Sequence, residues 1–168
     1  MQPGPQRTAT DDLLRHNEAY AAAFETGDRP APPARKVAVL TCMDARLDPA
    51  QALGLQLGDA HVIRNAGGVA TTDAIRSLLI SQRLLGTEEI LVVHHTECGM
   101  LSFTDAELRD RIEAETGVRP PFPMESFTDT DESVRETVAR IQASPFIPHQ
   151  AVRGFVYDVA TGRLREVG

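Results

Sequence analysis

The sequence predicts an α/β fold in which a mainly parallel central sheet is flanked by helices. Two short, almost continuous apolar runs, 36–41 and 89–95, are typical of strands buried on both faces. Segments with apolar residues at helical spacing alternate with such runs. Strands that alternate with helices form mainly parallel sheets. The helices that connect such strands pack on the sheet, so we expect helices over both of its faces. The 168 residues suit one domain on the usual scale of roughly 100–200 residues.

An N-terminal helix is expected over Asp11–Thr26, with Thr10 as its cap and acidic residues in its first turn. A proline-rich link, Arg29–Pro33, separates this helix from the rest of the chain. A tethered amphipathic helix cannot bury its own apolar stripe, so it must lie on the body of the protein or extend onto a partner subunit, and we expect the latter. The chain therefore divides into an N-terminal helical arm with its link, 1–34, and one α/β domain, 35–168. The stripe consists of Leu13, Leu14, Tyr20, Ala21 and Phe24.

Strands and helices are expected in turn along the domain. The predicted strands cover 36–41, 61–64, 89–95, 151–157 and 164–167. The residues Ala160-Thr-Gly162 between the last two strands indicate a hairpin. The predicted helices cover 74–85, 105–115 and 129–143, and Gly86 and Gly117 end the first two.

Charge and hydropathy exclude several classes of partner. Lys and Arg number 17 and Asp and Glu 24, which gives a formal charge of −7. An acidic chain lacks the cations that neutralise phosphates, so we expect neither a nucleic acid nor a membrane as partner. The sequence also has no apolar run near the roughly 18–20 residues that cross a bilayer and no signal-peptide pattern at its start. We expect a cytoplasmic protein.

Two cysteines and a histidine carry the strongest chemical signal. Cys42 follows the first predicted strand, His95 ends the third, and Cys98 lies three residues further on. The carboxyl ends of parallel strands form the usual site of such sheets. Thiolate and imidazole ligands suit Zn²⁺ better than Mg²⁺ or Ca²⁺, and three ligands leave a fourth position open for catalysis. A disulfide between the cysteines and a pair of unrelated buried thiols are the alternatives.

A carboxylate and a guanidinium follow the first cysteine, in the order Cys42-Met-Asp44-Ala-Arg46. Arginine can hold a carboxylate through two hydrogen bonds, which fixes its orientation and keeps it ionised. Asp44 and Arg46 are therefore candidate catalytic residues beside the metal. The alternative is a surface ion pair that contributes little.

The remaining candidates carry weaker signals. Gly67 and Gly68 precede a predicted helix and could present backbone N–H groups to an anion such as bicarbonate, although a tight turn explains them as well. His94 lies on the opposite face of its strand from His95 and is expected to be packed or interfacial. The other histidines are interpreted as surface residues without partners: His16, His61 and His149.

The pattern Cys42-x-Asp44-x-Arg46, followed by His95-x-x-Cys98-Gly99, resembles that of the β-class carbonic anhydrases, in particular their short actinobacterial-type members. Asn65-Ala-Gly-Gly68 is similar to the segment between the two motifs in that family. The resemblance implies one Zn²⁺ per chain, held by Cys42, His95 and Cys98, with Asp44 as a conditional fourth ligand. It also implies a homodimer or homotetramer.

The reaction implied by this resemblance is the reversible hydration of carbon dioxide to bicarbonate and a proton. Zinc-bound hydroxide would be the nucleophile, and the Asp44–Arg46 dyad would orient it and gate the site. One alternative is a COS or CS2 hydrolase on the same scaffold. Another is a catalytically silent zinc-binding regulatory protein whose site Asp44 keeps closed. A redox protein is a third alternative, which lacks a Cys-x-x-Cys motif.

Overall fold

The computed structural model describes residues 7–168. The chain forms two compact units, and the boundary between them falls between Pro30 and Ala31. The first contains α1 (Ala9–Ala22), none of whose residues is buried. The predicted bounds, 11–26 with a Thr10 cap, are wrong at both ends. Thr8 caps the helix instead, because Thr8 and Asp11 each accept a hydrogen bond from the other's backbone N–H.

The second unit, Ala31–Gly168, is built on a five-stranded sheet in the order β2-β1-β3-β4-β5. The first four strands are parallel, and β5 pairs antiparallel with β4 through the predicted hairpin. The predicted strands are confirmed within one residue at each end. Their bounds are β1 Val37–Cys42, β2 Ala60–Asn65, β3 Glu89–His95, β4 Ala151–Tyr157 and β5 Leu164–Val167.

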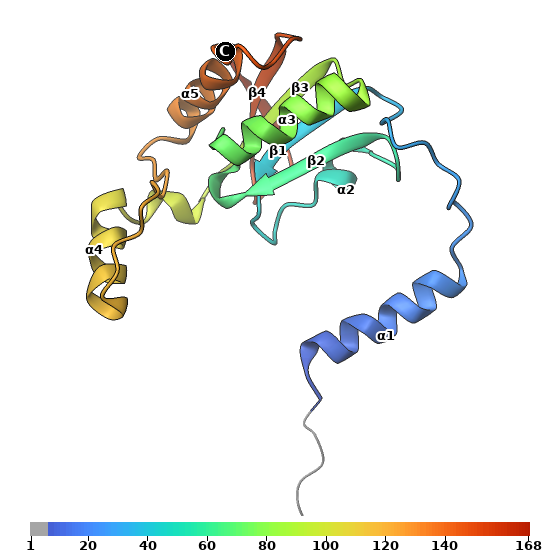
Figure 1. The fold of residues 1–168 in the computed structure, drawn as a ribbon, viewed down its shortest axis with the longest axis horizontal. Helices are drawn as coiled ribbons and strands as arrows, with labels where there is room; N and C mark the ends of the chain where they lie inside the picture. Colours follow the sequence, from blue (N-terminus) through green and yellow to red (C-terminus); the bar gives the residue numbers. More distant parts are fainter. Residues whose placement is uncertain (1–6) are drawn as a thin grey trace, which may run out of the picture. The chain divides into compact units, whose positions relative to one another are not determined.

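Helices α3 (Thr72–Leu85) and α5 (Thr130–Gln142) both pack on one face of this sheet, and Figure 1 shows α3 across it. The other face carries a short helix that the sequence did not predict, α2 (Pro49–Leu53), beside Val39 and Val93. Five residues are too few to show helical periodicity. The main core consists of Ala38, Leu40, Ala70, Ala74, Leu78, Ile90, Val92, Ile141, Ile147 and Val152.

The expectation of helices over both faces is confirmed, but the helices are unevenly divided between the faces, and the handedness of the connections explains why. The chain steps from β1 to β2 in one direction and then from β2 to β3 and β4 in the other. Because connections between parallel strands are right-handed, a reversal of direction moves the connecting helix to the opposite face. The first connection precedes the reversal and the later ones follow it, so α2 lies on the face opposite α3 and α5.

The same reversal places the candidate site. Ligand sites in open α/β sheets form where the strand order reverses, outside the carboxyl ends of the strands. Here these are the ends of the adjacent strands β1 and β3, whose last residues are Cys42 and His95. A sequence gap of more than 50 residues therefore becomes a contact between neighbours.

After β3 the chain forms α4 (Asp105–Thr116) and a proline-containing loop before α5. Thr104 and Glu107 cap the start of α4, and Gly117 ends it as predicted. Asp105 accepts hydrogen bonds from the backbone N–H groups of Met124 and Ser126, which ties the loop to the helix. No helix among residues 7–168 has the length and hydropathy to cross a membrane.

Candidate metal centre

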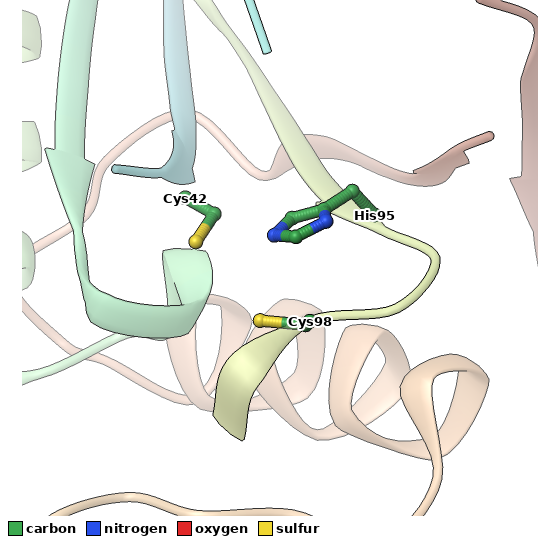
Figure 2. A group of neighbouring side chains, drawn as sticks. All are labelled: Cys42, His95 and Cys98. Carbon is green, nitrogen blue, oxygen red and sulfur yellow. The ribbon is translucent and has the colours of Figure 1, made fainter. Parts of the chain in front are cut away.

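Cys42, His95 and Cys98 converge on one point (Figure 2), and one side-chain ligand atom of each lies within 4.8 Å of the other two. Cys42 ends β1 and His95 ends β3, while Cys98 starts the 3₁₀ turn η2 (Gly99–Leu101). All three side chains are buried, and both cysteines are free thiols. The structure thus brings together the three residues that the sequence predicted as metal ligands.

The hydrogen bonds of His95 leave one ring nitrogen available. Nδ1 lies 2.8 Å from the carbonyl oxygen of Thr96 and donates to it, so Nε2 presents its lone pair. Among the described residues Nε2 has no hydrogen-bond partner, although the side chain is fully buried. Buried polar atoms are rarely left without a partner. An unpartnered imidazole nitrogen beside two thiols is the donor set that Zn²⁺ prefers, so the residues fit this metal.

The two sulfur atoms also influence each other's ionisation. The neighbouring Cys98 side chain lowers the pKa of Cys42 to about 4, against the opposing effect of burial. The same contact raises the pKa of the Cys98 thiol, and the Cys42 thiolate raises that of His95. The lowered pKa favours the thiolate of Cys42, and the thiolate is the form that binds metals.

Asp44 and Arg46 form the predicted pair. Arg46 donates from Nε to Asp44 Oδ1 at 3.0 Å and from Nη2 to Asp44 Oδ2 at 2.8 Å. These bonds, with one from the Arg46 backbone N–H, hold the pKa of Asp44 well below its usual range. Asp44 Oδ2 also lies 3.7 Å from His95 Nε2. The carboxylate is thus ionised and lies between the guanidinium and the ligand atoms.

Several known proteins are similar to this chain over most of its length. A family model described as carbonic anhydrase matches residues 37–119. β-Carbonic anhydrase 1 of Mycobacterium tuberculosis is 55% identical over 161 residues, covering 95% of this chain and 98% of that protein. The chain belongs to the β-carbonic anhydrase family. The resemblance inferred from the motifs and the predicted enzyme class, a β-class carbonic anhydrase, are confirmed.

Two further relatives differ in the activity that their names give. A carbonic anhydrase structure from Streptococcus mutans aligns with a TM-score of 0.91 at 47% identity, covering 97% of this chain and 99% of that one. The carbon disulfide hydrolase of Acidianus is 37% identical over 182 residues, covering 93% of this chain and 87% of that protein. The α/β fold is therefore confirmed by a solved structure.

The sequence analysis did not single out Arg64, which lies beside the candidate site. Arg64, near the end of β2, donates from Nε to the carbonyl of Cys42 at 2.9 Å. Its Nη2 donates to the carbonyls of Asp44 at 2.8 Å and Leu47 at 3.0 Å. One side chain thus holds the loop that carries both a candidate ligand and the carboxylate. An arginine at the carboxyl end of a predicted parallel strand was the available signal.

The two glycines have a clear packing role. A Cβ on Gly68 would lie 2.9 Å from both the Cys42 nitrogen and the Thr41 carbonyl carbon, and the residue adopts a φ of +73°. Gly67 and Gly68 belong to the 3₁₀ turn η1 (Ala66–Gly68), whereas α3 starts later, behind its Thr71 cap. The geometry supports the tight-turn interpretation, and anion binding there stays a prediction.

The remaining histidines divide into buried and exposed. His94 is fully buried, as predicted: its Nε2 lies 3.2 Å from the Gly68 carbonyl, and its ring stacks on Phe127. The prediction for His61 is wrong, because this half-buried residue pairs with Ser81 Oγ at 2.7 Å. His16 and His149 are exposed, as predicted.

Proposed function

We propose that this chain catalyses the reversible hydration of carbon dioxide to bicarbonate and a proton, with one Zn²⁺ held by Cys42, His95 and Cys98. The observation that carries the proposal is the convergence of two buried thiols and an unpartnered imidazole nitrogen beside an arginine-held carboxylate. Relatives named as carbonic anhydrases, at 47–55% identity, support it.

The chain's own residues would divide the work. When bound, zinc would lower the pKa of a water molecule and so supply a nucleophile near neutral pH. Asp44 would accept a hydrogen bond and fix the direction of attack. Arg46 would keep Asp44 ionised and away from the ligand atoms. Because Asp44 Oδ2 is only 3.7 Å from His95 Nε2, a small movement would make it a fourth ligand and close the site.

Apolar side chains next to the cysteines suit an apolar substrate. Met100 is buried against Cys42 and Cys98, and Ala66, Phe103 and Phe127 pack around them. Carbon dioxide needs few polar contacts, and a wall of this kind limits competing water. We also propose that the N–H groups of Gly67 and Gly68 contact bicarbonate.

The proposed working unit is a homodimer or homotetramer. Residues 35–168 would form the zinc-binding domain, and residues 1–34 an arm that lies on a partner subunit. Support comes from the apolar stripe of α1, in which Leu13 and Leu14 are 69% and 60% exposed.

Hydrolysis of CS2 or COS is the second candidate, because carbon disulfide hydrolases at 37–39% identity are among the relatives. A zinc-binding regulatory protein without activity is the remaining alternative. The 55% identity to a carbonic anhydrase favours carbon dioxide.

Stopped-flow measurement of carbon dioxide hydration, with metal analysis of the same sample, tests the proposal. We expect about one zinc per chain and rapid hydration. Sulfide release from CS2 without carbon dioxide hydration would establish the second candidate. Full zinc with neither activity from pH 6 to pH 9 would identify a silent zinc protein.

A further inference from the structure

We propose that Glu97 is a positioning residue that holds the Arg46 guanidinium where it can receive Asp44. The orientation of Arg46 can be measured without any assumption about activity. Only the expected effect on hydration rests on the function proposed above.

The hydrogen bonds of Arg46 are shared between Asp44 and Glu97 without competition. Asp44 takes Nε and one bond from Nη2. Glu97 accepts from the two terminal nitrogens. Its carbonyl oxygen accepts a second bond from Nη2 at 3.1 Å, and its Oε2 accepts from Nη1 at 3.3 Å. Guanidinium groups donate in a fixed planar fork, so acceptors on both sides fix the plane of Arg46.

The backbone of Glu97 makes this possible. Its φ is +55°, a left-handed conformation that is uncommon for residues other than glycine. On one side of this turn the Thr96 carbonyl accepts from His95 Nδ1, and on the other the Glu97 carbonyl accepts from Arg46. One backbone conformation therefore orients both a candidate metal ligand and the arginine of the dyad.

The partly exposed position of Arg46 makes this support necessary. Its side chain is 48% exposed, and without the Glu97 acceptors it could rotate into solvent. Asp44 would then lose its main partner, and the nearest site residue to it would be His95. Exposed ion pairs are weak. We therefore expect the Glu97 carbonyl to contribute more than the Glu97 carboxylate to the orientation of Arg46.

Three variants of the full-length, zinc-loaded protein distinguish the contribution of the Glu97 carbonyl from that of its carboxylate. Glu97→Gly keeps the left-handed turn and removes the carboxylate, and Glu97→Gln removes only the charge. Glu97→Val places a β-branched side chain where the left-handed conformation is strongly disfavoured, so the carbonyl must move. Lys36→Val is the matched control, because Lys36 has the same kind of backbone, with φ +54°, outside the site.

The first readout is the rate at which the Arg46 Nε–H exchanges with water, measured by NMR. We expect Glu97→Gly and Glu97→Gln to raise this rate by about two- to fivefold. In Glu97→Val we expect a rise of about tenfold or more, and a similar fall in kcat with KM unchanged. Zinc content should stay as in the wild type in Glu97→Gly and Glu97→Gln, which keep the backbone conformation, and Lys36→Val should change neither the exchange rate nor kcat.

Two results would overturn the proposal. One is wild-type exchange of Arg46 in all three Glu97 variants. The other is an equal effect in Lys36→Val, which would indicate a general response to backbone strain. If Glu97→Val does not fold, the Gly and Gln variants decide in the same way. If the wild type hydrates no carbon dioxide, the proposed function fails, while the exchange rates still decide the role of Glu97.

Discussion

At the scale of single residues, the loop from Cys42 to Leu47 depends on two arginines. Arg64 holds three of its backbone carbonyls, and Arg46 holds the Asp44 carboxylate. The backbone and the reactive side chain thus have separate supports. This separation predicts that the carboxylate can be altered while the fold and the metal ligands remain.

Asp44→Asn tests the role of the carboxylate. The amide is nearly isosteric but uncharged and a poorer acceptor, so we expect kcat for carbon dioxide hydration to fall by about 100-fold or more. Zinc content should remain at about one per chain, since three ligands remain. Arg46→Ala should also reduce hydration, because it leaves Asp44 free to approach the metal ligands. Wild-type rates in Arg46→Ala would mean that the pair is only a surface ion pair.

Cys98→Ser tests the ligand set. A serine hydroxyl is a poor zinc ligand, so zinc should fall from about one per chain to near zero. Thermal unfolding should occur at a lower temperature, because the metal would link the ends of β1 and β3. Asp44→Asn serves as the control that keeps the ligands. Full zinc in Cys98→Ser would remove Cys98 from the proposed site.

At the scale of elements, close backbone approaches set the geometry around β1. The turn η1 lies against the end of β1 because Gly68 has no side chain. The loop before α5 is likewise held by one carboxylate, that of Asp105. Both contacts are testable by single substitutions with matched controls.

Gly68→Ala should destabilise the protein by roughly 2–4 kcal/mol, since its Cβ meets backbone atoms in addition to the strain of a positive φ. Gly54→Ala is the control: Gly54 has a similar φ of +63° but nothing within 4 Å of an added Cβ. Gly54→Ala should lower the free energy of unfolding by only about 1 kcal/mol. Urea unfolding of both variants measures the difference. An equal loss of stability in the two variants would show that the backbone near Cys42 moves enough to accommodate the added Cβ.

Asp105→Asn should destabilise the protein by about 1–2 kcal/mol in urea unfolding at pH 7. Burial opposes ionisation of Asp105, but hydrogen bonds from Ser126 and Met124 outweigh it and lower the pKa. A lowered folded-state pKa contributes stability above the unfolded value of about 3.9, which is lost as pH falls through the folded value. Asp105→Asn should therefore lose less stability than the wild type between pH 5 and pH 2. Asp73→Asn, at a side chain that is 75% exposed in the first turn of α3, is the control and should lower the free energy of unfolding at pH 7 by less than Asp105→Asn does.

At the scale of the whole molecule, α1 is a helix without a buried residue. Isolated helices of this length are marginally stable in water, so α1 needs a surface to cover its apolar stripe. A partner subunit would supply such a surface and make the arm part of the assembly.

Removal of residues 1–30 should therefore weaken self-association, measured by sedimentation at micromolar concentration. We expect at least a dimer for the intact chain and a shift toward monomer for the truncated one. Leu13→Gln with Leu14→Gln should act in the same direction, since both side chains are exposed and their loss leaves no cavity. A monomeric intact chain, or equal association with and without the arm, would contradict the prediction.

The sequence alone determined the order of the strands along the chain, the α/β class and the three candidate ligands. Strands buried on both faces are continuous apolar runs, and Cys42, Asp44, Arg46, His95 and Cys98 stand in a fixed local pattern. Each apolar run, and each of the two motifs 42–46 and 95–98, lies within a few residues, so each can be recognised without the fold.

Only the tertiary structure decided how these segments meet. The reversal of strand order brings the ends of β1 and β3 together, and it explains why α3 and α5 share one face. Arg64 and Glu97 could not be assigned roles from the sequence, because their contacts with Cys42, Asp44 and Arg46 depend on a backbone path between strands. Short capped segments such as α2 were missed for a related reason: a single turn held by its cap leaves no periodic signal.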